Sequence, residues 1–405
     1  MPDEAAPASS RLPLVVYVLA VGTFLMLTTE FVVAGILPEI AADVRVDVAK
    51  AGLLITVFAV GMIVGAPAMA MLTLRLPHRL TLMLALAVFA AGHVIVALSS
   101  AFAMLLAARF LTALATGAFW ALAAVVATRV APAGTSSRAV GVVNAGGMLA
   151  TVLGVPLGAL ATQFFGWRGT FWALAVLAVA AIPLIVRHVP ASGDAHQAVS
   201  IRAELRALRS RRLLLALAAC AATTGGVLAA YSYLAPLLTG RAGIAENLVP
   251  LVLAGFGAGS LAGSIGGGRL GDTHPHAATI AAPAVTALVL LVMCFVASAA
   301  VPTTVLVVLL GFFGLGANPI LISLAVRYAD HAPTLGSSLS VAAFNLGTAV
   351  ASWVGGAALE SGLGTVGPVV VGAVISAMTL IPVIALCLMA PSLMASTSSS
   401  RRDRL

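Results

Sequence analysis

Two charged residues lie inside apolar segments, where a charge is costly and therefore informative. Glu30 falls within the apolar run over residues 14–38, and Arg109 falls within the run over residues 102–127. An ionised carboxylate in hydrocarbon costs several kcal/mol unless it is protonated, paired or solvated by a cavity. Both residues are therefore candidates for proton exchange or for binding a charged group.

Glu30 and Arg109 are also predicted to lie at similar depth. Glu30 is about 12 Å from the end of its run, and Arg109 is about 10 Å from the start of its own, at 1.5 Å per helical residue. Two such residues can carry coupled chemistry if their helices are neighbours. The alternative is a structural ion pair that locks two helices together.

The segments that must position these residues are apolar almost throughout. The chain has 405 residues, of which 61% are hydrophobic and 8% charged, whereas soluble domains carry about 25% charged residues. Apolar runs of 20 or more residues recur along the chain, and runs of this length cross a bilayer as helices. The short alternating strands of a membrane barrel are absent from the pattern. We predict an all-α polytopic membrane protein with twelve transmembrane helices, at about 14–38, 50–73, 80–99, 102–127, 139–163, 170–187, 213–238, 248–268, 277–299, 303–326, 337–359 and 366–390. The first run is too long for a signal-peptide core, so we interpret it as a retained span.

The positive charges are distributed asymmetrically. With the N-terminus in the cytoplasm, 16 of the 21 Lys and Arg residues fall inside, and only Arg45, Lys50, Arg168 and Arg241 fall outside. This is the positive-inside rule, which explains the net charge of +8 without a nucleic-acid partner. The sequence predicts a multi-pass protein of the plasma membrane with both termini cytoplasmic.

The chain divides into two similar halves. Residues 1–187 form an N-terminal six-helix bundle, residues 188–212 a polar cytoplasmic linker, and residues 213–405 a C-terminal six-helix bundle with a short tail. The linker is basic, and a surface helix at the anionic leaflet explains it better than a regulatory role does. A four-residue pattern recurs at an interval of 201 residues, from Asn144, Gly146, Ala150 and Gly154 to Asn345, Gly347, Ala351 and Gly355. A parallel repeat of this kind places a substrate site between the halves, near the midplane.

Several neutral polar and aromatic residues fall within the predicted spans. Apolar walls with a few polar groups suit a neutral amphipathic ligand, although each residue is equally able to pack against a neighbouring helix. Candidates for substrate binding are Thr29, Phe119, Trp120, Asn144, Tyr231, Tyr233, Asn318, Phe344 and Asn345. His93, the only histidine inside a predicted span, is interpreted as a polar packing residue. The three cysteines have no metal-ligand spacing, and no nucleotide-binding or hydrolase motif is present in a suitable context.

The sequence resembles the major facilitator superfamily along essentially its whole length, and within it the twelve-span drug:proton antiporters. The carrying segments are TTEFVVAGILPEIAADV at residues 28–44, RFLTALATG around Arg109, GVPLG at residues 154–158 and GWRGTFWALA from Gly166. The first is similar to the branch that contains chloramphenicol, sugar and arabinose-polymer exporters. The resemblance implies that the first and fourth spans are neighbours, and that Gly154, Pro156 and Gly158 form an antiporter signature. Helix packing alone also explains these three residues.

One motif of the family is degenerate. The cytoplasmic loop after the second span has Thr73 where the family has an aspartate, whereas the second half keeps Gly268, Leu270 and Asp272. The resemblance implies a gate at Gly268 and Asp272. It leaves open whether the first copy of the loop still gates.

Taken together, these features predict a proton-coupled antiporter that exports small amphipathic compounds. Glu30 takes up a proton from outside and releases it inside, in competition with substrate, and Arg109 modulates this exchange. A sugar or nucleoside exporter, an importer or uniporter on the same scaffold, and a membrane enzyme or signalling scaffold are the alternatives. We expect a monomer with no metal and no cofactor.

Overall fold

The computed structural model describes residues 12–73, 76–132, 135–190, 210–273, 275–329 and 333–389. These residues are helical between short connections, with no β-strand among them. The first half contains α1 (Leu14–Gly35), α2 (Leu37–Asp43), α3 (Val48–Ala51), α4 (Leu53–Thr73), α5 (His78–Leu98), α6 (Phe102–Val130), α7 (Ser136–Leu149), the π-helix η1 (Ala150–Gly154) and α8 (Val155–His188). The second half contains α10 (Arg211–Tyr231), α11 (Leu234–Gly240), η2 (Glu246–Leu248), α12 (Val249–Thr273), α13 (Pro275–Val296), α14 (Ala300–Gly316), α15 (Asn318–Tyr328), α16 (Pro333–Glu360), η3 (Gly364–Val366), α17 (Gly367–Met378) and α18 (Leu380–Met389).

The long helices match the predicted spans. Eleven stretches of the described chain are long and apolar enough to cross a membrane, and the apolar segment Arg138–Gly154 is shorter. That segment continues through η1 into α8, which has a non-helical residue at Gly166 with φ 70° and ψ 167°. The predicted fifth and sixth spans therefore lie on either side of Gly166. Most of the predicted linker and both termini lie outside the described residues.

Several predicted spans are broken rather than continuous. The first breaks at Ile36 (φ −125°, ψ 17°), just before Pro38 in the first turn of α2. The tenth breaks at Ala317, and Pro319 stands in the first turn of α15. Proline lacks the backbone N–H and restricts the residue before it, so a new helix begins there more readily than the old one continues.

The two halves repeat the same helix contacts at the interval found in the sequence. A Cβ added at Gly146 of α7 would lie 2.9 Å from the carbonyl carbon of Ala20 on α1. A Cβ at Gly347 of α16 would lie 2.8 Å from the carbonyl carbon of Ala221 on α10, and both members of this second pair are 201 residues further along. Glycine allows the backbones this close approach. The repeated pattern therefore marks equivalent helix contacts in the two halves.

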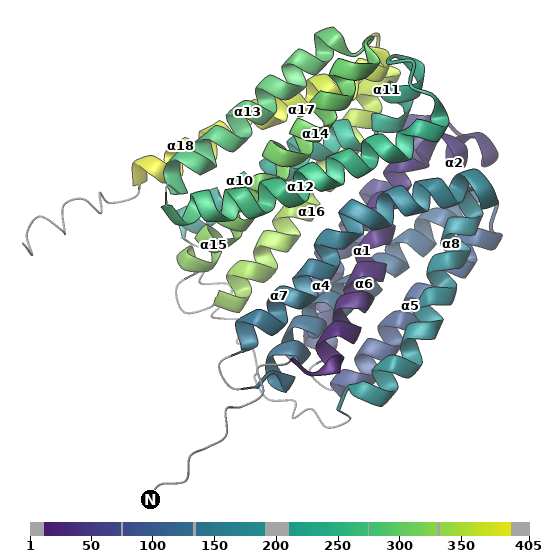
Figure 1. Ribbon diagram of the computed structural model, residues 1–405, viewed down its shortest axis with the longest axis vertical. Helices are drawn as coiled ribbons and strands as arrows, with labels where there is room; N and C mark the ends of the chain where they lie inside the picture. The colour runs from purple at the N-terminus through teal and green to yellow at the C-terminus, as the bar shows by residue number, and fades with distance from the viewer. Residues whose placement is uncertain are drawn as a thin grey trace, which may run out of the picture.

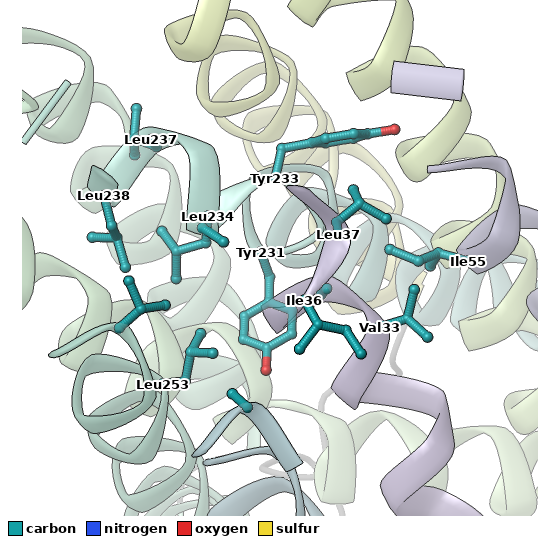
Figure 2. Packing of buried hydrophobic residues seen from close by; sticks show 14 of the residues in the cluster. Val33, Ile36, Leu37, Ile55, Tyr231, Tyr233, Leu234, Leu237, Leu238 and Leu253 are labelled. Carbon is teal, nitrogen blue, oxygen red and sulfur yellow. The ribbon is translucent and has the colours of Figure 1, made fainter. Parts of the chain in front are cut away.

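Among the described residues, the hydrophobic core that joins the two halves lies at one end. This cluster joins Val33, Ile36 and Leu37 of the first half to Tyr231 and Leu234 of the second, as Figure 2 shows. It lies at the end of the molecule that contains α2 and α11 (Figure 1), the end that the sequence prediction assigns to the outside of the cell. We call it the outer end. Toward the opposite end each half has cores of its own.

Candidate functional site

Arg109 of α6 is anchored to two other helices. The side chain is 1% exposed, and its Nη1 donates to both the carbonyl and the hydroxyl oxygen of Thr29 on α1, each at 3.0 Å. Nε donates to the carbonyl of Leu54 on α4 at 3.4 Å, and the guanidinium lies 4.1 Å from the ring centroid of Phe58. Nη2 is buried and has no partner among the described residues. It is therefore the group that remains available to a carboxylate or a ligand.

The hydroxyl of Thr29 continues this network to α5. Its Oγ1 lies 2.8 Å from Nε2 of His93, and Nδ1 of His93 lies 2.7 Å from the carbonyl oxygen of Phe89. Thr29 and His93 are both almost completely buried. One polar network thus connects α1, α4, α5 and α6 within the first half.

Glu30 lies next to this network. Its side chain as a whole is partly exposed, but protein atoms surround the carboxyl group on most sides. The carboxylate interacts electrostatically with Arg109. The alternative, a structural ion pair between Glu30 and Arg109, is not formed: Asp43 and Arg168 make the one ion pair seen in the described ranges. The carboxyl group of Glu30 also has no hydrogen-bond partner among the described residues. The geometry leaves a carboxyl group free to exchange a proton, close to a positive charge that is fixed in place.

The GVPLG segment packs on α1 on both sides of Glu30. A Cβ at Gly154 would lie 2.9 Å from Cγ2 of Thr28, and one at Gly158 would lie 3.5 Å from Cβ of Val32. Pro156 stands in the first turn of α8, immediately after the π-helix. The π-helix also reaches the other half, since a Cβ at Gly257 of α12 would lie 2.6 Å from Cα of Val152. The π-helix and the GVPLG segment together therefore connect α1, which carries Glu30, with the opposite half. A π-helical turn of this kind is frequent at functional sites.

Cross-half contacts close the outer end. Oγ of Ser352 on α16 donates across the halves to the carbonyl of Gly52 at 3.2 Å, and within the second half the hydroxyl of Tyr233 donates to the carbonyl of Ser352 at 2.7 Å. Phe31 and Tyr231 meet edge to face with ring centroids 6.5 Å apart. We call this set of contacts the outer seam.

A cavity of about 480 Å³ lies beside the outer seam, lined by both halves. Glu39 and Gln163 reach it from the first half, and Thr239 and Glu246 from the second. Nε2 of Gln163 donates to the backbone carbonyl of Glu246 at 3.1 Å. Glu39 lies outside the spanning helices and its side chain is exposed. The partial loss of water around its carboxyl raises the pKa above the ordinary value, with a further increase from the negative charge of Glu246.

The other predicted binding residues are distributed over several cores. Phe119 is fully buried and packs against Gly22, whereas Tyr231 and Tyr233 belong to the core at the outer end. Phe344 packs on a separate core of the second half. The remaining ones are Trp120, which is half-buried, Asn144, which is exposed, and Asn318 and Asn345, whose side-chain oxygens are buried without a partner in the described chain. The structure does not gather these side chains into one pocket, and their role in binding stays a prediction.

The predicted gate is described only in part. Gly268 and Asp272 lie in the last turns of α12, but their side-chain surroundings fall outside the described residues, and so does the environment of Thr73 at the end of α4. Sequence reasoning found Glu30 and Arg109 because charge is rare in these spans. It did not find that His93 contacts Thr29. The two are 64 residues apart, so no local pattern connects them.

A fold of two repeated helical halves, with a buried arginine and a free carboxyl group in one of them, is that of a secondary membrane transporter. Residues 19–337 match the model of the Major Facilitator Superfamily. The chain belongs to this family, whose members are transporters and not enzymes, as the sequence predicts. It is thus a multi-pass membrane protein with a small-molecule substrate.

Two relatives from other bacteria match along nearly their whole length. The chain is 37% identical over 360 residues to a chloramphenicol resistance protein of Streptomyces lividans, covering 88% of this chain and 92% of the relative. It is 32% identical over 363 residues to the inner membrane transport protein YdhP of Escherichia coli K12, covering 90% and 93%.

Among solved structures, a bacterial homologue of the human lysosomal transporter Spinster matches with a TM-score of 0.70 at 16% identity, covering 92% of this chain and 94% of that one. That structure is in an inward-facing, unoccupied conformation. The likeness confirms the predicted fold of twelve spans in two bundles.

Proposed function

We propose that this chain is a proton-coupled antiporter that exports small amphipathic organic compounds of the chloramphenicol kind from the cytoplasm. The observation that carries the proposal is Glu30, a partly exposed carboxyl group within a membrane span and beside a fixed arginine. The named function of the Streptomyces lividans relative supports the substrate class. We place the protein in the plasma membrane as a monomer, with both termini in the cytoplasm and with no nucleic-acid partner.

The proposed cycle uses one carboxyl group in two states. When Glu30 is ionised, the unpartnered Nη2 of Arg109 provides a positive partner nearby. When Glu30 is protonated, the charge that must be solvated inside the membrane is removed, and such charges are costly there. Substrate and proton therefore compete for the same region, and each is released on the side where the other binds.

Transport into inside-out membrane vesicles tests the proposal. An antiporter should accumulate radiolabelled chloramphenicol when the vesicle interior is acidified, and Glu30→Gln should lower the initial rate more than tenfold because it cannot exchange a proton. Asp47→Asn, which changes an exposed carboxylate in the outer loop before α3, is the matched control and should transport like the native chain.

Two outcomes contradict the proposal. If Glu30→Gln accumulates substrate as fast as the native chain, the carboxyl group is not the coupling group. If acidification instead drives preloaded substrate out of the vesicles, the scaffold works as an importer. A panel of sugars, nucleosides and antibiotics in an exporter-deficient bacterium then identifies the substrate class.

A further inference from the structure

The hydrogen bonds around His93 have a defined direction. The carbonyl oxygen of Phe89 can only accept, so Nδ1 of His93, 2.7 Å away, must carry the proton of the ring. Nε2 of the neutral ring then has a lone pair, and the hydroxyl of Thr29, 2.8 Å away, donates to it. The lone pairs of the same hydroxyl accept from Arg109. The order of donation is therefore from Arg109 to Thr29 to His93 to the backbone of α5.

Other protonation states of His93 do not fit these contacts. With the proton on Nε2, a lone pair on Nδ1 would face the Phe89 carbonyl, and two acceptors would meet without a proton. A doubly protonated ring would add a positive charge next to Arg109, between the rings of Phe89 and Phe171 at centroid distances of 4.0 and 5.6 Å. Arg109 on α6 and Glu30 on α1 are the charged groups that interact with the network in the described chain.

Thr29 behaves differently from its neighbours on α1. The hydroxyls of Thr23 and Thr28 donate to the carbonyls four residues earlier, Leu19 and Phe24, which is the usual bond of a threonine within a helix. Thr29 instead donates across to α5. Without an acceptor at His93 we expect its hydroxyl to turn to the carbonyl of Leu25, and the contact with Arg109 to be lost or weakened.

We propose that His93 is a positioning residue for the proton-coupling site. Its Nε2 lone pair holds the Thr29 hydroxyl in the orientation that receives Nη1 of Arg109, and this leaves Nη2 as the free group beside Glu30. His93 itself neither gains nor loses a proton during transport. The inference rests on the proposed function, because it assigns a role within proton coupling.

A double-mutant cycle on efflux tests the inference. His93→Leu removes the acceptor, Thr29→Val removes the hydroxyl, and the double variant removes both; His93→Gln restores an acceptor oxygen on an uncharged side chain. The readouts are the initial rate of proton-driven efflux and the pH at which that rate is half-maximal. Thr23→Val is the matched control, since Thr23 is equally buried on α1 and bonds only to its own helix.

We expect His93→Leu and Thr29→Val each to lower the rate about tenfold, which corresponds to about 1.4 kcal/mol. Each should also move the half-maximal pH upward by about one unit, the shift that corresponds to a tenfold effect. The reason is that a misplaced Arg109 stabilises the ionised Glu30 less. The double variant should be no worse than either single one, because residues that act through one contact are not additive. His93→Gln should recover most of the rate, and Thr23→Val should leave the half-maximal pH unchanged.

The outcomes separate this inference from the proposed function. A half-maximal pH that stays at the native value in His93→Leu, or a double variant whose loss is the product of the two single losses, overturns the role of His93 even if the variants melt at lower temperature. If His93→Leu does not fold, the half-maximal pH of Thr29→Val and of His93→Gln decides. The role of His93 requires this pH to move upward in Thr29→Val and to stay near the native value in His93→Gln; any other result overturns it. A native chain without pH-dependent efflux overturns the proposed function instead.

Discussion

A methyl group at Gly52 should force the outer seam open. A Cβ at this position would overlap the hydroxyl of Tyr233 and lie 2.7 Å from its Cζ, whereas carbon atoms in proteins pack at about 3.5 Å or more. The ring would have to retreat by at least about 0.8 Å to relieve the contact with Cζ alone. Tyr233 has no room to do so, because it is 1% exposed and its hydroxyl also faces Gly356, where a Cβ would lie 2.6 Å away.

The cost falls on one conformation only. Overpacking costs about 1–3 kcal/mol, and loss of the bond from Tyr233 to the carbonyl of Ser352 adds about 1 kcal/mol. Gly52 belongs to the first half and Tyr233 to the second, so separation of the halves at the outer end relieves both. A penalty of about 2–4 kcal/mol shifts the population toward the outward-open state by roughly 30- to 1,000-fold.

Cysteine labelling measures this shift. Leu37 is fully buried in the shared core at the outer end, so Leu37→Cys, in a chain whose native cysteines are replaced, should react slowly with a membrane-impermeant maleimide. Adding Gly52→Ala should speed the reaction strongly and lower transport, and Tyr233→Leu should reverse both effects. Gly240→Ala is the control, since a Cβ there meets nothing within 4 Å. Unchanged labelling in Gly52→Ala would refute the reasoning.

Two further predictions concern the repeat and the outer cavity. Gly146→Ala and Gly347→Ala should each lower the melting temperature to a similar extent, because both methyl groups would press on a backbone carbonyl at equivalent positions; a large difference between the two would argue against equivalent packing. We expect Glu39 to regain its ordinary pKa when the seam opens, so that its ionised form weakens the closed seam. This penalty is fully present above the raised pKa and absent below the ordinary value of 4.5. Acidification outside should therefore slow labelling of Leu37→Cys, and Glu39→Gln should remove that pH dependence; a dependence that persists in the variant would assign it to another group.

The helices were predictable because the bilayer demands them. Every backbone group in hydrocarbon must be satisfied within the segment, so a run of about 20 apolar residues has few alternatives to a helix. The breaks at Ile36 and Ala317 were not predicted, although Pro38 and Pro319 stand next to them in the sequence. Proline is tolerated inside membrane helices, so its presence alone does not show whether a helix bends, breaks or continues.

The charged part of the site was also predictable, whereas its neutral part was not. Glu30 and Arg109 stand out because charge is rare at this depth. Thr29 and His93 are ordinary polar residues of membrane helices, and their contact depends on how α1 and α5 are rotated about their axes. The same holds for Tyr233, whose position between Gly52 and Gly356 follows from the register of three helices. Single-sequence patterns do not fix these rotations.

The anchoring of Arg109 limits where the driving force of the cycle can arise. Its guanidinium is hydrogen-bonded to backbone oxygens of α1 and α4, so we expect it to move together with Glu30 when the halves move. The separation of the two charges then stays nearly constant over the whole cycle. What changes around the carboxyl group is the water that reaches it and the apolar wall that the second half contributes through Tyr231 beside Phe31. In the proposed cycle the proton affinity of Glu30 is therefore switched by the moving half, while the arginine provides a constant offset.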